Sequence, residues 1–247
     1  KIRMIRSKQF WFAVATLFGT TVGAGIFAIP YVFIKAGFWL SLFYLAFLGV
    51  VVMLLQLMYG EITLRTKERH RLPGYTQKYL GRFWERIVLG VEILGSYGAL
   101  LVYLILGGQF LFLIFGTLWG GSYGVYVFIF WLVFSMGILL SLKLVGPIEF
   151  VLSLLLIVAL VVVVAVGLPS FRIVNLSSVN WANFFLPYGI FLFAISGGVA
   201  IPEMKEELGS HLNLLKPAIV LGTVLAVVVS ALFGLGVAGL SGSATTT

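Results

Sequence analysis

The sequence predicts an all-helical integral membrane protein with seven spans, of which the first and the sixth are interrupted. The composition is 61% hydrophobic and 10% charged, with a mean hydropathy of +1.14. Apolar stretches of about 20 residues, the length that a helix needs to cross a bilayer, recur along the chain. Glycine and proline gather inside two of these stretches. No other segment is suited to a water-soluble core, so we expect a single membrane domain over residues 1–247.

The expected spans follow one another along the chain. They lie near residues 10–36, 38–59, 87–115, 124–142, 148–168, 186–208 and 217–240. Each is long enough for a helical crossing, whereas a barrel strand needs only ~10 residues of alternating polarity. A basic connection joins the second and third spans, and its amphipathic stretch over 75–79 predicts a short helix at the lipid headgroups.

The basic residues fix the expected orientation. Lysines and arginines are concentrated before the first span and in alternate connections, which leaves Lys35 and Arg172 on the opposite side. This places the amino terminus in the cytoplasm and the chain, as a multi-pass protein, in the cell membrane. The same distribution, facing the anionic inner leaflet, explains the net charge of +8. We therefore expect the lipid bilayer and not a nucleic acid as the partner of this charge.

The first span contains the sequence GTTVGAGIFAIP at residues 19–30. Gly19 and Gly23 alone fit a small-xxx-small face for close helix packing, which needs no ligand. The sixth span is interrupted in the same way, with LPYGIFLFAISGGVAIPEM at residues 186–204. Four spans separate the two, so they cross the membrane in opposite directions. Paired, glycine-broken helices in inverted halves indicate a secondary transporter with five-plus-five inverted-repeat symmetry.

Broken helices offer a site for a zwitterion. Irregular backbone at membrane depth survives only where protein, water or a ligand supplies the missing hydrogen bonds. Amides near residues 23–26 begin a new half-helix and would hold a carboxylate, while carbonyls ending the preceding half-helix could receive an amino group. Thr20 and Thr21 could bind the carboxylate or donate to carbonyls of their own helix.

Two segments carry a family resemblance. GTTVGAGIFAIPYVFIKAGF and FAISGGVAIPEMKEEL resemble the amino acid and auxin permease group and the related bacterial aromatic amino acid permeases of the amino acid-polyamine-organocation superfamily. The resemblance implies a central substrate site between the first, third, sixth and eighth helices. It also implies ten or eleven spans, so we expect this seven-span chain to be part of a longer permease. The substrate contacts that it implies are Thr21, Gly23, Ala24, Gly25, Phe193, Ala194, Ser196 and Gly197.

Several other polar residues are candidates for coupling or gating. Glu92 lies inside the third span, where a carboxylate could relay protons or pair with a basic residue near the membrane surface. Tyr97, near the middle of the same span, could face the substrate or simply pack. Glu203, with Glu206 and Glu207, could pair with Arg6 or Lys8 as an inner gate, or form a solvated helix end. We expect a proton or sodium as coupling ion, no other cofactor and no bound metal.

The function expected from these features is transport by alternating access, with the first and sixth helices rocking against the rest. Aromatic or large neutral amino acids are the expected substrates. An intramembrane enzyme is disfavoured, because the spans lack histidine, cysteine and aspartate. A passive channel or a seven-helix receptor-like protein remains as the alternative. A retinal-binding receptor is disfavoured because the seventh span has no lysine.

Overall fold

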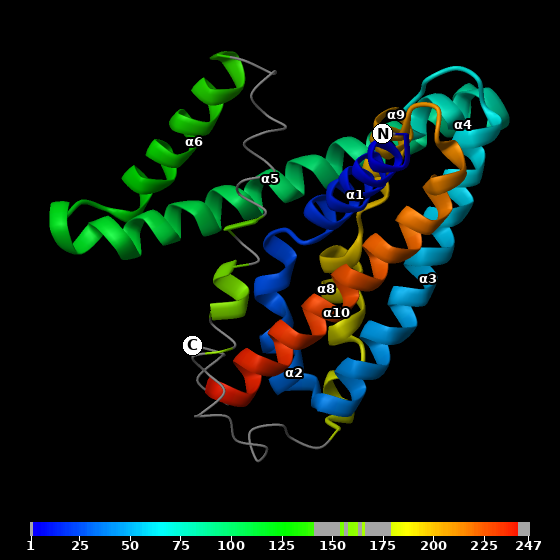
Figure 1. Cartoon of the computed structure of the whole chain (residues 1–247). Helices are drawn as coiled ribbons and strands as arrows, with labels where there is room; N and C mark the ends of the chain where they lie inside the picture. The colour runs from blue at the N-terminus through cyan, green and yellow to red at the C-terminus, as the bar shows by residue number, and fades with distance from the viewer. Residues whose placement is uncertain (1, 141–153, 156–157, 163–164, 166–178, 242–247) are drawn as a thin grey trace. The chain divides into compact units, whose positions relative to one another are not determined.

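In a computed structural model, the described residues are 2–140, 154–155, 158–162, 165 and 179–241, and they form helices and connections without a strand (Figure 1). The expected fifth span, 148–168, lies mostly outside these residues. We expected one membrane domain, and the chain groups into two compact units. One unit holds residues 1–71 with 152–247, and the other holds residues 72–151.

The first unit contains both broken spans and two long unbroken helices. Its elements in chain order are α1 (Ile2–Thr21), η1 (Ala24–Ala28), α2 (Ile29–Ala36), α3 (Phe38–Arg65), η5 (Trp181–Asn183), α8 (Leu186–Ile195), η6 (Gly198–Ala200), α9 (Ile201–Leu208), η7 (Leu212–Leu214) and α10 (Leu215–Ser241).

Four described helical segments are long and apolar enough to cross a membrane, or five if a bent pair counts as one span. The four are Phe38–Arg65, Arg82–Trp119, Leu186–Leu208 and Leu212–Leu240, and the bent pair is Lys8–Thr21 with Ala24–Ala36. Three expected spans are longer than predicted, because α3 continues to Arg65 and α5 and α10 begin before residues 87 and 217. The protein is therefore a multi-pass, all-helical membrane protein over the part that the structure describes.

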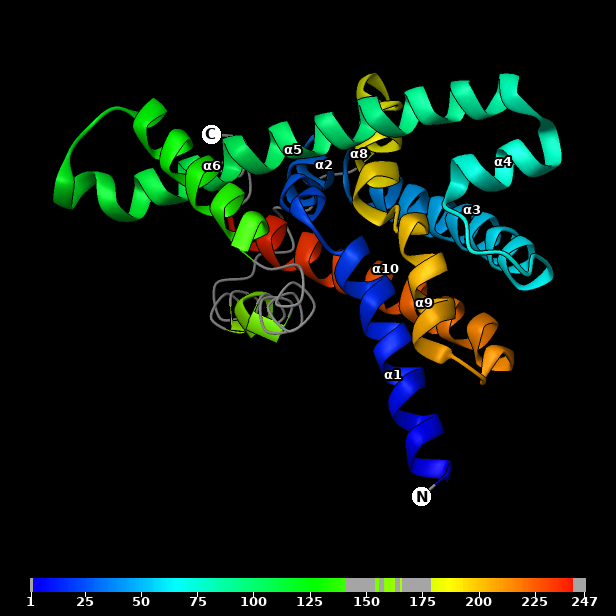
Figure 2. The same cartoon turned by 90° about the horizontal axis from the view of Figure 1, so that it is seen from above.

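The two broken spans lie antiparallel against each other. α1 packs against α9, and α2 packs against α8, so the first half of each span meets the second half of the other (Figures 1 and 2). The short η1 likewise packs on α8, and η6 packs on α1. This pairing brings the two interruptions together.

α10 joins the elements of this unit, because it packs against α1, α2 and α3. Small residues allow the close approach. A Cβ added at Gly222 would lie 3.0 Å from Leu17 Cδ2, and one added at Gly234 would lie 2.6 Å from Ile29 Cγ2. Leu17 and Ile29 are fully buried. Glycine on α10 thus brings this helix close to both halves of the first broken span, as small residues do at interfaces between membrane helices.

The second unit consists of α4 (Leu72–Leu80), α5 (Arg82–Trp119) and α6 (Tyr123–Leu140). α4 includes the predicted headgroup helix over 75–79. α5 packs against α6 at Gly107 and Gly108, where an added Cβ would lie 2.3 Å from the Phe130 ring and 2.4 Å from Val127 Cγ2. At Gly108 the Val127 Cα is also only 2.9 Å away, so a side-chain rotation alone cannot make room.

Gly108→Ala should loosen the packing of α5 on α6. Overpacking of this kind costs about 1–3 kcal/mol, and we expect a lower midpoint of thermal unfolding in detergent. Gly98→Ala, on the same helix with open space around the added Cβ, is the matched control and should leave the midpoint unchanged or raise it slightly. Equal effects of the two substitutions would contradict this packing.

Candidate functional site

The first span bends where its glycines lie. α1 ends at Thr21, and the axis turns by 49° between the helix ending there and the one beginning at Ala24. Gly23 is extended, with φ −114° and ψ −150°. Its N–H donates to the Thr21 carbonyl at 3.0 Å, and its carbonyl accepts from the Ile26 N–H at 3.2 Å. The break therefore keeps part of its hydrogen bonding through short local turns.

The sixth span breaks in a similar way. α8 ends at Ile195, Ser196 is extended with φ −79° and ψ 109°, and η6 follows Gly197. The next helix begins with a proline in its first turn, Pro202, as α2 begins with Pro30. Proline is tolerated at this position because the first amides of a helix have no acceptor within it.

The two breaks touch at glycines. A Cβ added at Gly25 would lie 2.7 Å from Ala194 Cα and 3.0 Å from a ring carbon of Phe193. One added at Gly197 would lie 2.0 Å from Thr21 Oγ1. Both glycines are buried. Each break thus rests against the last turn of the opposite half-helix at a distance that only glycine permits.

These contacts are reciprocal. When Ile29-Pro30 is aligned with Ile201-Pro202, Gly25 falls on Gly197 and Thr21 falls on Phe193. The contact of Gly25 with Phe193 and that of Gly197 with Thr21 are therefore one contact made twice. The same alignment matches the bounds of α2 with those of α9, and it places Gly37 on Gly209, which end these helices with φ of 90° and 55°.

The hydroxyl groups at the breaks donate to their own helices. Thr20, Thr21 and Ser196 each donate to the carbonyl four residues earlier, at 2.8, 2.7 and 2.6 Å. Of the two roles expected for Thr20 and Thr21, the structure shows the second, donation to a helix carbonyl. Each oxygen keeps lone pairs, so it can still accept a hydrogen bond but has no proton left to give.

The expected substrate contacts divide into two groups. Thr21, Gly25, Ala194 and Gly197 are buried where the breaks touch, whereas Thr20, Gly23, Ala24, Phe193 and Ser196 keep exposed surface. Phe193 is the most open side chain, at 47% exposure. Tyr97 lies on α5 in the second unit, where its side chain is exposed. Among the expected contacts, the accessible groups are therefore the backbone at Gly23 and Ala24, two hydroxyl side chains and the ring of Phe193.

The end of the sixth span carries ion pairs that differ from the expected ones. Glu203 pairs with Arg71 at 2.8 Å and Glu206 lies 3.6 Å from Arg69, both in the connection after α3. We expected Arg6 or Lys8 as partners, and the Arg6 side chain lies outside the described residues. Hydrogen bonding to Glu203 raises the pKa of the Arg71 guanidinium above its ordinary value. Arg71 therefore keeps its positive charge in this pair.

Lys205 and Glu207 fasten α9 to two further helices. The Lys205 ammonium donates to the carbonyl of Thr63 and, at 3.0 Å, to that of Thr66, where α3 ends. A cation at this position suits the negative end of the helix dipole. The Thr16 hydroxyl on α1 donates to Glu207 at 2.7 Å, a bond between residues 191 positions apart. Nothing local in the sequence signals either contact, because each partner comes from a distant helix.

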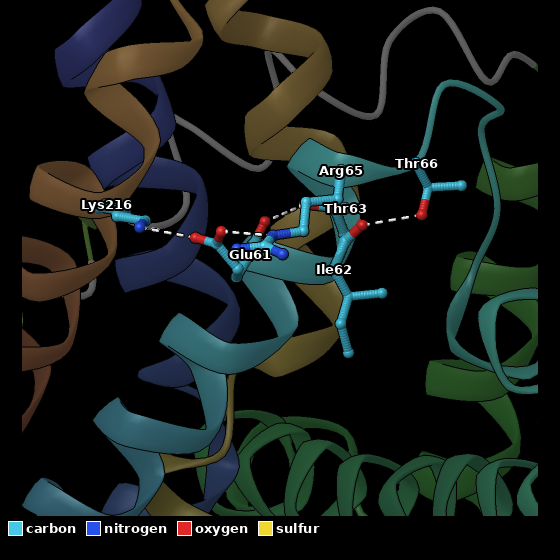
Figure 3. Close-up of polar contacts among 7 residues, drawn as sticks. Glu61, Ile62, Thr63, Arg65, Thr66 and Lys216 are labelled. Atoms are coloured by element: carbon cyan, nitrogen blue, oxygen red, sulfur yellow. Dashed lines mark hydrogen bonds and ion pairs between the residues drawn. The ribbon is translucent and has the colours of Figure 1, made fainter. Parts of the chain in front are cut away.

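Glu61, near the end of α3, has two basic partners. It accepts from Lys216 of α10 at 2.6 Å and from Arg65, one turn later on α3, at 2.7 Å (Figure 3). This cluster ties the end of α3 to the start of α10. Glu92, on α5 in the second unit, is partly buried and has an interaction partner. Among the described residues, no three histidine, aspartate or glutamate side chains lie together as a metal site would require.

A polar pair between α3 and α10 was not predicted. Gln56 and Thr223 are both buried, and the Thr223 oxygen lies 2.5 Å from the Gln56 side-chain oxygen and 2.8 Å from the Ile219 carbonyl. One hydroxyl proton cannot serve both acceptors, and the Gln56 amide nitrogen has no partner as assigned. Exchanging the amide oxygen and nitrogen resolves both difficulties. Gln56 then donates to Thr223, which donates to its own helix.

The comparisons with known proteins agree with this architecture. A family model described as the tryptophan/tyrosine permease family matches residues 6–245. The tyrosine-specific transport system 1 of Haemophilus influenzae (strain ATCC 51907 / DSM 11121 / KW20 / Rd) is 24% identical over 224 residues, which cover 90% of this chain and 56% of that protein. The chain thus spans about half the length of this curated relative. No solved structure matches the chain significantly.

Gly197→Ala should push the two breaks apart. The added methyl group meets the Thr21 hydroxyl, which cannot rotate away without losing its bond to Leu17. We expect a loss of about 1–3 kcal/mol in stability, measured by thermal unfolding in detergent. Gly198→Ala is the neighbouring control, since its Cβ would meet nothing within 4 Å. Thr21→Ala should partly rescue Gly197→Ala, and a failure of this rescue would argue against the contact.

Proposed function

This chain belongs to the tryptophan/tyrosine permease family, and from this premise we propose that it forms part of a secondary transporter for an aromatic amino acid. The relative named above is a tyrosine-specific transport system, which makes tyrosine the first substrate to test. We place the transporter in the cytoplasmic membrane with its amino terminus inside, because that orientation puts nearly all basic residues on the cytoplasmic side. The family supports amino acid transport, and the membrane-spanning helices support a multi-pass membrane protein.

The reciprocal contact of the two breaks is the observation that carries this proposal. Gly25 on Phe193 and Gly197 on Thr21 are equivalent positions in two antiparallel spans. We interpret these spans as corresponding members of two inverted repeats of a five-plus-five fold. In such folds, substrate binds near the middle of the membrane where paired helices are interrupted. The recurrence of this contact in both spans supports their assignment to two corresponding halves.

We propose that the exposed backbone of the breaks binds the charged ends of the amino acid. The amide of Ala24 begins η1, keeps exposed surface and has no acceptor within that helix, so it suits the carboxylate. The hydroxyl oxygens of Thr20 and Ser196, whose protons are already donated, suit the ammonium group. Phe193, beside them and half exposed, is positioned to contact an aromatic side chain. Tyr97 remains a candidate contact from the second unit.

The contacts within the first unit suggest which parts move together. We expected the first and sixth helices to rock against the rest. Both are fastened to α3 and α10 by the glycine contacts, by Lys205 and by the buried core around Leu17, Ile29, Phe33, Ile201 and Ile219. We therefore propose that the four spans of this unit move as one body during alternating access. Close-packed interfaces of this kind resist sliding within the body.

The coupling ion is a proton or sodium in this proposal. Glu92 is the acid within a span that a proton relay would use. Glu203 and its neighbours, with the basic side chains around them, are the proposed inner gate. The structure supports Arg71 as the partner of Glu203, and Arg6 stays a candidate that only substitution can test.

Transport should be measured with the complete gene product in proteoliposomes. We expect saturable uptake of labelled tyrosine, driven by an imposed proton or sodium gradient, with unlabelled tryptophan and phenylalanine as competitors. The gradient that drives uptake identifies the coupling ion. Uptake that follows the tyrosine gradient alone and does not saturate would indicate a passive channel. If no aromatic amino acid is taken up or competes, the proposed substrate class is wrong.

Gly23→Val should weaken substrate binding without preventing membrane insertion. Its side chain would stand over the exposed backbone that we assign to the carboxylate, while extended φ and ψ values accommodate valine locally. We expect the Kd for tyrosine to rise at least about tenfold, the effect of losing one charge-assisted hydrogen bond. Gly189→Val, in the open on α8 away from the break, is the control and should bind as the wild type does. Wild-type affinity in Gly23→Val would overturn the site assignment.

A further inference from the structure

The corner between α4 and α5 presents a surface that transport does not explain. We call residues 78–86 the elbow. The chain turns there at Gly81, whose φ of 92° separates the end of α4 from the start of α5. The two helices pack against each other, and Tyr75 and Thr76 on α4 are buried. The elbow is thus a defined corner of the second unit, and most of its side chains are exposed.

Large apolar side chains are exposed at the elbow. Tyr79, Leu80, Phe83 and Trp84 are 55%, 65%, 69% and 50% exposed, and the rings of Phe83 and Trp84 meet edge to face with their centroids 5.6 Å apart. Exposed aromatic residues in such density require an apolar environment. Tyrosine and tryptophan in particular favour the level of the lipid headgroups.

Exposed cations lie in the same segment. Lys78, Arg82 and Arg86 are exposed, and the one acid of the elbow, Glu85, is partly buried. Elsewhere, Arg65, Arg71 and Lys216 have carboxylate partners. Among the described residues, Arg82 and Arg86 have no ion pair, although Glu85 is on the same helix turn. Their charges are therefore not neutralised within the described part of the chain.

Helix electrostatics disfavour the two arginines at this position, and Glu85, the single acid in the first turn of α5, opposes two positive charges with one negative charge. Arg82 is the first residue of α5, and Arg86 follows one turn later. The start of a helix is the positive end of its dipole, where cations are destabilising and anions are stabilising. An external anion would reverse this effect. The arginines of the elbow therefore favour a bound anion, and its exposed aromatic side chains favour an apolar environment.

We propose that the elbow binds anionic phospholipid, with the lipid phosphate held by Arg82 and Arg86 and with Phe83 and Trp84 among the upper acyl chains. A free phosphate ion would meet the charges but leave the aromatic rings in water. A bilayer surface with anionic lipids provides both partners within a few ångströms. The bound lipid would fix the depth of the corner from which α5 crosses the membrane. This inference is independent of the substrate that the protein carries.

The test is lipid retention by the complete purified protein, measured by native mass spectrometry with phosphatidylglycerol and phosphatidylcholine as probes. A basic residue near an anionic surface contributes about fivefold to affinity, so losing two should cost about 25-fold. Arg82→Gln with Arg86→Gln should lower phosphatidylglycerol retention by that factor and leave phosphatidylcholine retention unchanged. Circular dichroism and thermal unfolding in zwitterionic detergent should match the wild type, which shows that the variant is folded.

Lys35→Gln with Lys67→Gln is the matched control, because it removes two exposed charges outside the elbow and outside the residues assigned to the site or the gate. It should keep phosphatidylglycerol retention within about twofold of the wild type. Equal losses in both double variants would show a response to net charge only and would overturn the proposal. So would unchanged retention in the arginine variant. Displacement of the lipid by millimolar inorganic phosphate would reassign the elbow to a free anion.

Discussion

The constraint on which this structure depends is that a helix in hydrocarbon cannot leave its amides and carbonyls without partners. Two spans of this chain interrupt their helical hydrogen bonding at the point where they contact each other. Three features limit the free-energy cost of these interruptions. Hydroxyls of Thr20, Thr21 and Ser196 donate to carbonyls of the preceding turn. Short turns around Gly23 and Gly197 replace part of the helix bonding. Each break is then partly covered by the other, because Gly25 and Gly197 are buried where the two spans touch. Gly23, Ala24 and Ser196 keep exposed surface, and this is where we propose that a solute supplies the remaining bonds.

The close contact between the two breaks depends on Gly25 and Gly197, because a side chain at either position would collide with the opposite span. The other helices of the unit pack around this contact. Because α1 meets α9 and α2 meets α8, each half-helix has a neighbour that runs along it. α10 then closes over α1 and α2 through its own glycines and reaches α3 through Gln56 and Thr223. The result is a body in which both breaks are held from outside by unbroken helices. An unbroken neighbour is what permits a span to be irregular without unfolding locally.

The sequence predicted the breaks well because their causes are local. Glycine clusters followed by Ile-Pro mark both positions, and the expected sixth span has the bounds that the structure shows. The ion-pair partners of Glu203 could not be predicted, because the choice among Arg6, Lys8 and Arg71 depends on which connection passes the end of α9. The contacts of Thr16 with Glu207 and of Gln56 with Thr223 could not be predicted either, because each joins residues of two helices that are far apart in the sequence. Hydropathy also failed to locate the ends of α3 and α5, since both helices continue through charged residues beyond the apolar core.

The polar contacts at the end of α9 differ in strength, and this difference bears on how a gate could open. The pairs of Glu203 with Arg71 and of Glu206 with Arg69 are exposed, and exposed pairs contribute little, typically about 0–1 kcal/mol each. Lys205 is partly buried and serves two carbonyls at the end of α3, where a charged donor is worth more than a neutral one. Breaking the two surface pairs therefore costs little, whereas separating α9 from α3 would leave a partly buried ammonium group without its two carbonyl partners. An inner gate built on these acids can release the arginine-bearing connection while α9 stays fastened to α3, which is consistent with movement of the whole unit and not of the broken helices alone.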